Sequence, residues 1–289
     1  MNLFELFASQ PSIYLGSALL IGLIVGSFLN VLVHRLPPMM ERRWQAEARE
    51  ALDLPEFPAG ERFDLLLPPS HCPHCRHRLR AWENIPLLSY LLLRGRCSAC
   101  KTRISPRYPL VELASAGLTV LAAWHFGVSA SAAAFMLLSW GLLALSLIDI
   151  EHQLLHDALV LPLLWLGLIA NAFGLFVPLD QALWGAVAGY LVLWSVYWMF
   201  RLVTGKEGMG YGDFKLLSMI GAWGGLQALP FTLLFSSLLG AVVGLILLRV
   251  QGRHVATPIP FGPYLALAGW IALLWGGQIP ASYLYFAGS

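Results

Sequence analysis

Long apolar runs dominate this chain and restrict it to a bundle of membrane helices. Its 289 residues are 58% hydrophobic and only 12% charged, whereas ordinary soluble domains carry about 25% charged residues. A helix needs about 20 apolar residues to cross a bilayer, and eight runs come near that length. They cover residues 13–33, 110–126, 130–150, 158–177, 181–200, 214–229, 231–248 and 261–286. We find no internal repeat. The sequence therefore predicts an all-α polytopic membrane protein with about eight transmembrane helices.

The basic residues indicate on which side of the membrane each loop lies. Thirteen of the eighteen Lys and Arg residues fall between Arg35 and Arg107, and basic loops stay on the cytoplasmic side. If the N-terminus is outside, eight crossings put every Lys and Arg inside, so we expect both termini outside. The expected division is a first span (residues 1–36), a cytoplasmic domain (37–107) and a seven-span membrane core (108–289).

Four cysteines form two C-x-x-C pairs within the basic block. The first motif contains Cys72 and Cys75, the second contains Cys97 and Cys100, and 21 residues separate the two motifs. Four thiolates at this spacing suit one tetrahedral zinc ion. The alternative, disulfides or unpaired thiols, depends on the compartment, and a reducing cytoplasm favours zinc. The nearby histidines are expected to be solvated neighbours, with replacement of a ligand as the alternative: His71, His74 and His77.

A glycine-rich stretch, residues 208–215 (GMGYGDFK), places an acid between two apolar runs. An aspartate near the middle of a membrane helix costs about 2.5–3.5 kcal/mol on insertion scales, so Asp213 requires an explanation. Either the stretch is an ordinary loop, or its glycines let backbone approach a catalytic carboxylate and adopt dihedral angles that other residues avoid. Gly210, Gly212 and Lys215 are therefore supporting site candidates.

A second acid, Asp149, ends the run 130–150 at the same predicted membrane face as Asp213. Two carboxylates that converge in a low-dielectric site share one proton, and such a pair can activate water and protonate a leaving amine. The residues alone allow two interpretations: an aspartyl protease pair, or helix-end carboxylates solvated by lipid headgroups. Asp157, eight residues beyond Asp149, is a further candidate.

Two polar residues in the first two apolar runs are weaker candidates. Asn30 is an amide that needs hydrogen-bond partners, either in helix packing or at the active site. Glu112 either caps the start of its helix, where a carboxylate is favoured, or faces the bundle interior. We expect Glu112 to cap the helix.

The ordered motifs resemble those of the type IV prepilin peptidases, which are Gly-x-Gly-Asp intramembrane aspartyl proteases. The matching segments span almost the whole chain: GSFLNV (26–31), HRLP (34–37), both cysteine pairs, YPLVE (108–112), the Asp149 segment, GYGDFKL (210–216) and PFGPY (260–264). The resemblance implies that Asp149 and Asp213 are the catalytic pair and that the cysteines belong to a cytoplasmic zinc-binding domain. One departure is His156, because relatives commonly have proline before Asp157.

The resemblance also implies a reaction and its partners. Such an enzyme lies in the bacterial inner membrane and removes the basic leader of type IV prepilins and type II secretion pseudopilins at the cytoplasmic face. It then methylates the new N-terminal amine from S-adenosylmethionine. No strand followed by Gly-x-Gly-x-x-Gly indicates a nucleotide-type fold, so the cytoplasmic domain is the expected place for the methyl-donor site. No nucleic-acid partner is expected, and the oligomeric state stays open.

Two other functions are alternatives. A proton or metal-ion transporter would place acids near the bilayer midplane along a path, whereas Asp149, Asp157 and Asp213 are predicted at one face. A structural scaffold for a secretion complex is the third interpretation. The aspartate positions favour the protease.

Overall fold

The structure is a computed structural model that describes residues 3–55, 62–251 and 260–275. Within these residues it consists of helices and loops without a β-sheet, so the predicted all-α class is confirmed. The α-helices are α1 (Leu3–Ser9), α2 (Pro11–Ala51), α3 (Leu88–Leu92), α4 (Arg107–Phe126), α5 (Ala130–His152), α6 (Asp157–Ala172), α7 (Leu179–Thr204), α8 (Tyr211–Gly224), α9 (Ala228–Gln251) and α10 (Gly262–Trp275). A 3-10 helix, η1, covers Ala81–Asn84.

Every predicted apolar run contains a helix, but the helices differ in length. Five are long and apolar enough to cross a membrane: α2, α4, α5, α7 and α9. α6 and α10 are apolar but shorter. α8 has 14 residues and rises about 21 Å, less than the about 30 Å hydrocarbon core of a bilayer. The polytopic membrane fold is thus confirmed, and the number of eight crossings stays a prediction. Part of the last predicted run, residues 276–286, lies outside the described residues.

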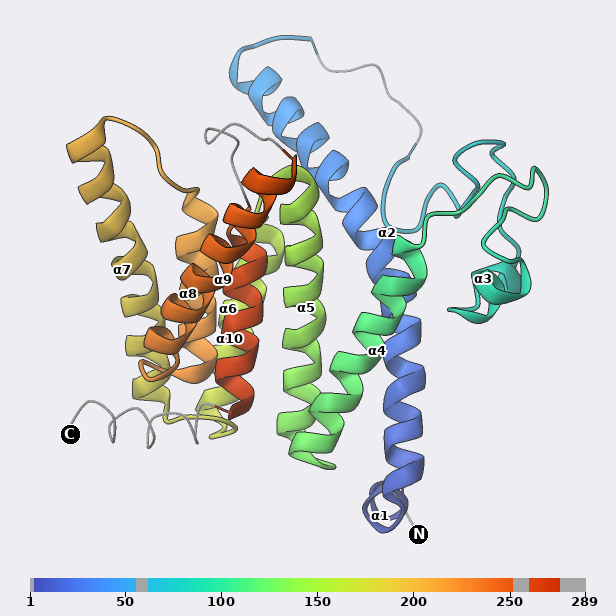
Figure 1. Cartoon of the computed structure of the whole chain (residues 1–289), viewed down its shortest axis with the longest axis horizontal. Helices are drawn as coiled ribbons and strands as arrows, with labels where there is room; N and C mark the ends of the chain where they lie inside the picture. The colour runs from blue at the N-terminus through green and yellow to red at the C-terminus, as the bar shows by residue number, and fades with distance from the viewer. Residues whose placement is uncertain (1–2, 56–61, 252–259, 276–289) are drawn as a thin grey trace. The chain divides into compact units, whose positions relative to one another are not determined.

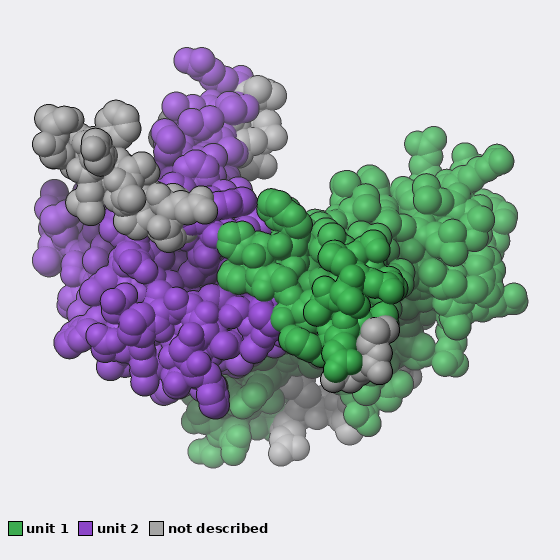
Figure 2. Space-filling model, turned by 90° about the horizontal axis from the view of Figure 1, so that it is seen from below, with its two compact units in different colours: residues 1–128 green, residues 129–289 purple. Residues whose placement is uncertain are grey.

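The chain packs as two compact units, residues 1–128 and 129–289, which Figure 2 colours separately. In the first unit α4 packs along α2 (Figure 1). Glycines of α2 allow the close approach: a Cβ on Gly22 would lie 2.6 Å from the Cα of Ala116, and one on Gly26 would lie 2.7 Å from the Cα of Glu112. These small residues therefore pack helix on helix, as is common in membrane bundles.

α2 is longer than the predicted first span. The sequence predicts a span ending near Val33, whereas one helix continues through Pro37 and Pro38 to Ala51. Each proline costs the helix a hydrogen bond. The buried Arg35 connects this part of α2 to the segment 64–68, which follows the helix in the chain. Its guanidinium donates to the carbonyls of Asp64 (2.9 Å) and Pro68 (2.6 Å). The expected boundary between residues 36 and 37 therefore falls inside one helix.

The second unit contains α5 to α10, and α8 packs against α6, α7, α9 and α10. Eleven of its fourteen residues are buried. Its backbone touches that of α7, since a Cβ on Gly221 would lie 2.2 Å from the oxygen of Gly185, and one on Gly189 would lie 2.6 Å from the oxygen of Leu217. A helix held this closely gives the residues at its amino end a defined position.

Asn171, near the end of α6, secures the other end of α8. Its amide nitrogen donates to the carbonyls of Ala222 (2.9 Å) and Trp223 (3.0 Å), which are among the carbonyls that a helix end leaves unpaired. Its amide oxygen accepts from the backbone of Phe176 and Val177. The buried amide thus joins α6, the loop after it and α8.

Candidate active site and metal centre

The predicted aspartates and their partners lie at the ends of four helices of the second unit, α5, α6, α8 and α10. Figure 1 labels these helices. Asp149 lies in the last turn of α5, Asp157 is the first residue of α6, and Asp213 is the third residue of α8. α10 begins at Gly262. The amino ends of α6, α8 and α10 carry partial positive charge, which favours carboxylates beside them. The fold thus supplies a local reason for acids at these helix ends.

Asp149 and Asp213 form a buried, interacting pair. Their exposed fractions are 5% and 7%, and the charge of Asp149 acts on Asp213. Oδ2 of Asp149 accepts a hydrogen bond from the backbone nitrogen of Gly262 at 3.0 Å. The carboxyl group of Asp213 accepts a hydrogen bond from the backbone nitrogen of Gly210. Because two buried like charges repel, such a pair binds one proton as a unit.

Gly262 is a site residue to which the sequence analysis assigned no role. A Cβ at this position would lie 2.6 Å from Oδ2 of Asp149 and 3.2 Å from Cδ2 of Leu155. Only glycine therefore lets the first amide of α10 reach the carboxylate. The signal was the motif PFGPY at residues 260–264, which shows a conspicuous glycine but not its partner.

The glycine-rich stretch differs from the expected turn. α8 begins at Tyr211, so Asp213 lies in the first turn of a helix. Gly208, Gly210 and Gly212 all have negative φ angles, so the expectation that they supply unusual dihedral angles is wrong. Gly212 is required for space, because its Cβ would lie 2.7 Å from the Cβ of Leu155. Gly210 has room for a Cβ, whose nearest neighbour would be 4.0 Å away.

Asp157 forms an ion pair with Lys215. The Nζ atom lies 2.7 Å from both carboxylate oxygens, and 52% of the Asp157 side chain is exposed. Exposed ion pairs contribute about 0–1 kcal/mol to the free energy of unfolding. The pair joins the amino ends of α6 and α8. His156, the residue that departs from the family pattern, is buried directly before α6.

Asn30 and Glu112 hold the helices of the first unit together. Nδ2 of Asn30 donates to the carbonyls of Gly26 (3.3 Å) and Tyr108 (3.1 Å). Glu112 is buried in the second turn of α4, and its Oε2 accepts from the backbone nitrogen of Leu87 at 2.8 Å. The expectation that Glu112 caps its own helix is wrong, because its carboxylate pairs with the amide before α3. A role of either residue in catalysis stays a prediction.

The four cysteines converge on one point. Their Sγ atoms all lie within 4.8 Å of one another, and two Sγ pairs, Cys72 with Cys100 and Cys75 with Cys97, are 3.9 Å apart. Tetrahedral zinc with Zn–S bonds of about 2.3 Å places its sulfurs about 3.8 Å apart, whereas a disulfide needs about 2.05 Å. Among the described residues the cluster consists of cysteines alone. The donor set therefore fits one zinc ion.

Both cysteine pairs form the same backbone turn, 25 residues apart. The amide of each first cysteine donates to the carbonyl five residues later, at 2.9 Å in both turns. The residue after each second cysteine, Arg76 or Lys101, has a positive φ of 57° or 59°. The two turns therefore form a local structural repeat within the cysteine cluster.

A buried carboxylate, Glu83, connects the two turns. The side chain of Ser98 and the backbone nitrogen of Arg80 (2.6 Å) donate to it, and these hydrogen bonds hold the pKa of Glu83 below its usual value. Nε2 of His77 lies 3.4 Å from the same carboxylate. The sequence analysis missed Glu83, since a single acid in a loop carries no spacing that marks its partners.

We expect purified protein to contain one zinc ion per chain. Replacing Cys72 and Cys97 with serine should remove the metal and open residues 70–103 to proteases, because metal binding to thiolates is largely folding free energy in so small a unit. Elemental analysis and limited proteolysis measure the two effects, and His74→Ala serves as the control that retains zinc. Metal-free protein that resists proteolysis as well as the loaded protein would contradict a structural role.

Two family models match the chain. The model described as the bacterial peptidase A24 N-terminal domain matches residues 20–126, and the model described as the type IV leader peptidase family matches residues 136–245. The first range contains the cysteine cluster, and the second contains Asp149 and Asp213. No solved structure matches the chain.

Relatives match over the full length and share one description. A protein of Stutzerimonas stutzeri is 67% identical over 98% of this chain and 98% of its own length. A protein of Pseudomonas aeruginosa is 65% identical over 100% of this chain and 99% of its own length. One of Xanthomonas campestris pv. campestris is 48% identical over 96% of this chain and 97% of its own length. Each is described as a prepilin leader peptidase/N-methyltransferase.

Proposed function

Because this chain belongs to the type IV leader peptidase family, we propose that Asp149 and Asp213 are the carboxylates with which it cleaves prepilins. Cleavage of prepilin leaders and N-methylation are its activities. The observation that carries the assignment is the buried pair itself: two acids from the ends of α5 and α8 that interact electrostatically. The transporter and scaffold alternatives gain no support from the relatives.

The pair is suited to general acid–base hydrolysis of a peptide bond. Together the carboxylates bind one proton, so one is ionised and takes a proton from a water molecule as the water attacks the carbonyl carbon. The protonated partner supplies a proton to the departing amine. The hydrogen bond from Gly262 orients the Asp149 carboxylate for this reaction, and the tight packing of α8 holds Asp213.

The substrates are proposed from the family and the site geometry together, and the location from the predicted topology. Clients are type IV prepilins and type II secretion pseudopilins, whose basic leader stays inside while the apolar helix lies in the bilayer. The enzyme lies in the bacterial inner membrane with both termini outside, and cleavage falls at the cytoplasmic edge. S-adenosylmethionine supplies the methyl group, for which the cytoplasmic domain is the proposed site. Zinc in the four-cysteine cluster is structural.

Incubation with a prepilin-like peptide tests this function. Mass spectrometry should show loss of the leader without S-adenosylmethionine, and loss of the leader with addition of one methyl group in its presence. A pre-cleaved peptide serves as the control for methylation alone. A peptide that stays intact under conditions in which a relative cleaves it would contradict the proposal.

Methylation should be separable from cleavage. It requires the freed amine and a donor site but no pair of acids, so Asp149→Asn protein should still methylate a pre-cleaved peptide at a rate within about twofold of the unchanged enzyme. Methyl transfer from labelled donor measures this rate. Loss of both reactions in a variant that retains its zinc would place the two sites together.

The topology is testable by labelling from outside the cell. A membrane-impermeant thiol reagent should label a cysteine introduced beside Asp180, in the first turn of α7, and leave one beside Arg62 unlabelled until the cells are opened. Orientation is set by the basic loops. Labelling beside Arg62 in intact cells would reverse the proposed orientation.

A further inference from the structure

Large apolar side chains project from residues 82–92, which we call the anchor segment. They are Trp82, Ile85, Leu88, Leu91 and Leu92, with exposed fractions of 43%, 43%, 50%, 71% and 66%. The segment comprises most of η1 and all of α3, and α3 has no buried residue. So many exposed large apolar side chains within eleven residues indicate an interaction site rather than ordinary protein surface.

The anchor segment is tied to α4 near the point where α4 becomes a candidate membrane span. The backbone nitrogen of Leu87 donates to the buried carboxylate of Glu112, which is the sixth residue of α4 and lies about 8 Å along the helix at 1.5 Å per residue. The span starts at Arg107. Tyr108, 43% exposed, and Trp82 are the residue types that favour the membrane–water interface.

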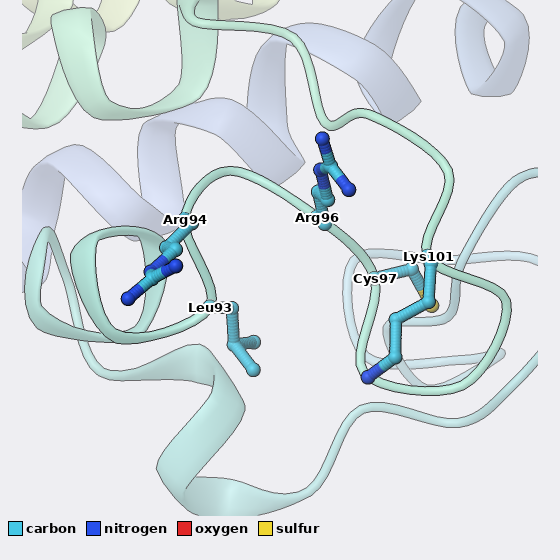
Figure 3. A pocket seen from close by; sticks show the side chains of 5 residues that line it. All are labelled: Leu93, Arg94, Arg96, Cys97 and Lys101. Carbon is cyan, nitrogen blue, oxygen red and sulfur yellow. The ribbon is translucent and has the colours of Figure 1, made fainter.

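Basic side chains surround the same segment. Between Arg76 and Arg107 the sequence has eight Lys and Arg residues and a single acid, Glu83, which is buried. We call residues 94–103 the basic loop. Its residues Arg94, Arg96, Cys97 and Lys101, together with Leu93, line a hollow of about 240 Å³, and Figure 3 shows these side chains. A wider hollow of about 570 Å³ is lined by Arg94, Arg96 and Arg103 together with Tyr90. The apolar anchor segment is therefore adjoined by a cationic loop.

The anchor segment and the basic loop form one rigid element. The amide of Gly95 donates to the carbonyl of Tyr90 (2.8 Å), and the amide of Ile104 donates to the carbonyl of Gly95 (2.8 Å). Gly95 has a φ of +65°, and a Cβ there would lie 2.9 Å from the Tyr90 ring. The turn that joins α3 to the second cysteine pair thus requires glycine and keeps the leucines and the arginines in a fixed relation.

We propose that the anchor segment lies in the membrane interface, with its apolar side chains among lipid acyl chains and the basic loop bound to anionic phospholipid headgroups. A lipid surface supplies both the apolar and the anionic partner within a few ångströms, and basic segments beside membrane spans bind such surfaces. A second copy of this surface would bring like charges together. The cysteine cluster is therefore held against the membrane surface instead of hanging free in the cytoplasm.

Lipid cross-linking of the full-length protein tests the anchor. The protein is placed at one copy per nanodisc, which excludes a second copy, with lipids that carry a photoreactive group in the acyl chain. Mapping by mass spectrometry should show a cross-linking yield for residues 82–92 that is within about threefold of the yield for α4. Residues 64–67 include Leu66, 77% exposed, and should stay near background as the solvent-exposed comparison.

Two double variants, each with a control variant, test the apolar contact and the basic contact separately. Leu91→Glu with Leu92→Glu should reduce labelling of the anchor segment at least fivefold, whereas Leu66→Glu should leave it unchanged. Arg94→Gln with Arg96→Gln should remove the preference for anionic over zwitterionic discs, whereas Arg43→Gln on α2 should retain it. Zinc content confirms that each variant is folded. Background labelling of residues 82–92 in unchanged, zinc-loaded protein would overturn the proposal and leave the surface to a protein partner.

Discussion

Replacing either Asp149 or Asp213 with asparagine is expected to abolish leader cleavage, with a loss of roughly 10⁴-fold or more. Asparagine keeps the shape of the side chain and removes its exchangeable charge. The two acids are buried and interact, so we expect the pair to bind one proton as a unit. The double variant should therefore cost nothing beyond either single one, because catalytic residues that act as a unit are strongly non-additive. Initial rates with a prepilin substrate measure the loss.

Asp157→Asn is the matched control for this prediction. Asp157 is half-exposed and paired with Lys215, so its replacement loosens the contact between α6 and α8 without removing a buried acid. Cleavage should slow by about tenfold or less, and Lys215→Gln should have a similar effect because it breaks the same ion pair. An inactive Asp157→Asn protein beside an active Asp149→Asn protein would show that Asp157 is the true partner of Asp213.

The features that the sequence predicts well are those with a period or a spacing. Apolar runs indicate the helices because backbone groups in a bilayer must be satisfied within each span. Two C-x-x-C pairs indicate one four-thiolate cluster because few other arrangements suit that spacing. The basic loops predict Asp149 and Asp213 at one depth, which stays a prediction, and the structure shows both side chains buried at helix ends.

The features that the sequence does not predict depend on contacts between distant residues. Pro37 and Pro38 indicate a helix end, but α2 continues beside a loop that Arg35 holds. The position of Glu112 suggests a cap for its own helix, yet its partner is the amide of Leu87, 25 residues earlier. Local propensity carries no information about such partners, so tertiary contacts override it.

Gly262 shows why a motif can be visible while its role is not. Its φ is not positive, so no turn geometry demands glycine, and the first position of a helix accepts alanine well. The requirement comes from Oδ2 of Asp149, which would lie 2.6 Å from a Cβ. Only the packing of α10 against α5 reveals that this glycine makes room for a carboxylate.

Gly262→Ala is therefore expected to reduce cleavage by about 100-fold, the usual size of the effect when a reacting group moves by about 1 Å. The added methyl displaces the Asp149 carboxylate and breaks its hydrogen bond from the α10 amide. Gly240→Ala in α9 is the matched control, since its Cβ would meet only ordinary contacts at 3.5 Å or more, and it should retain activity within about twofold. Methylation of a pre-cleaved peptide and zinc content should stay unchanged in both variants.

The pH profile of cleavage separates a positioning role from simple destabilisation. A hydrogen bond to a carboxylate favours its charged form, so its loss in Gly262→Ala should move the profile of the residual activity, whereas partial unfolding would lower the rate equally at every pH. Gly240→Ala should show the original profile. Full activity in Gly262→Ala would mean that the α10 amide does not orient Asp149 during catalysis, and the pair would then depend on α5 and α8 alone.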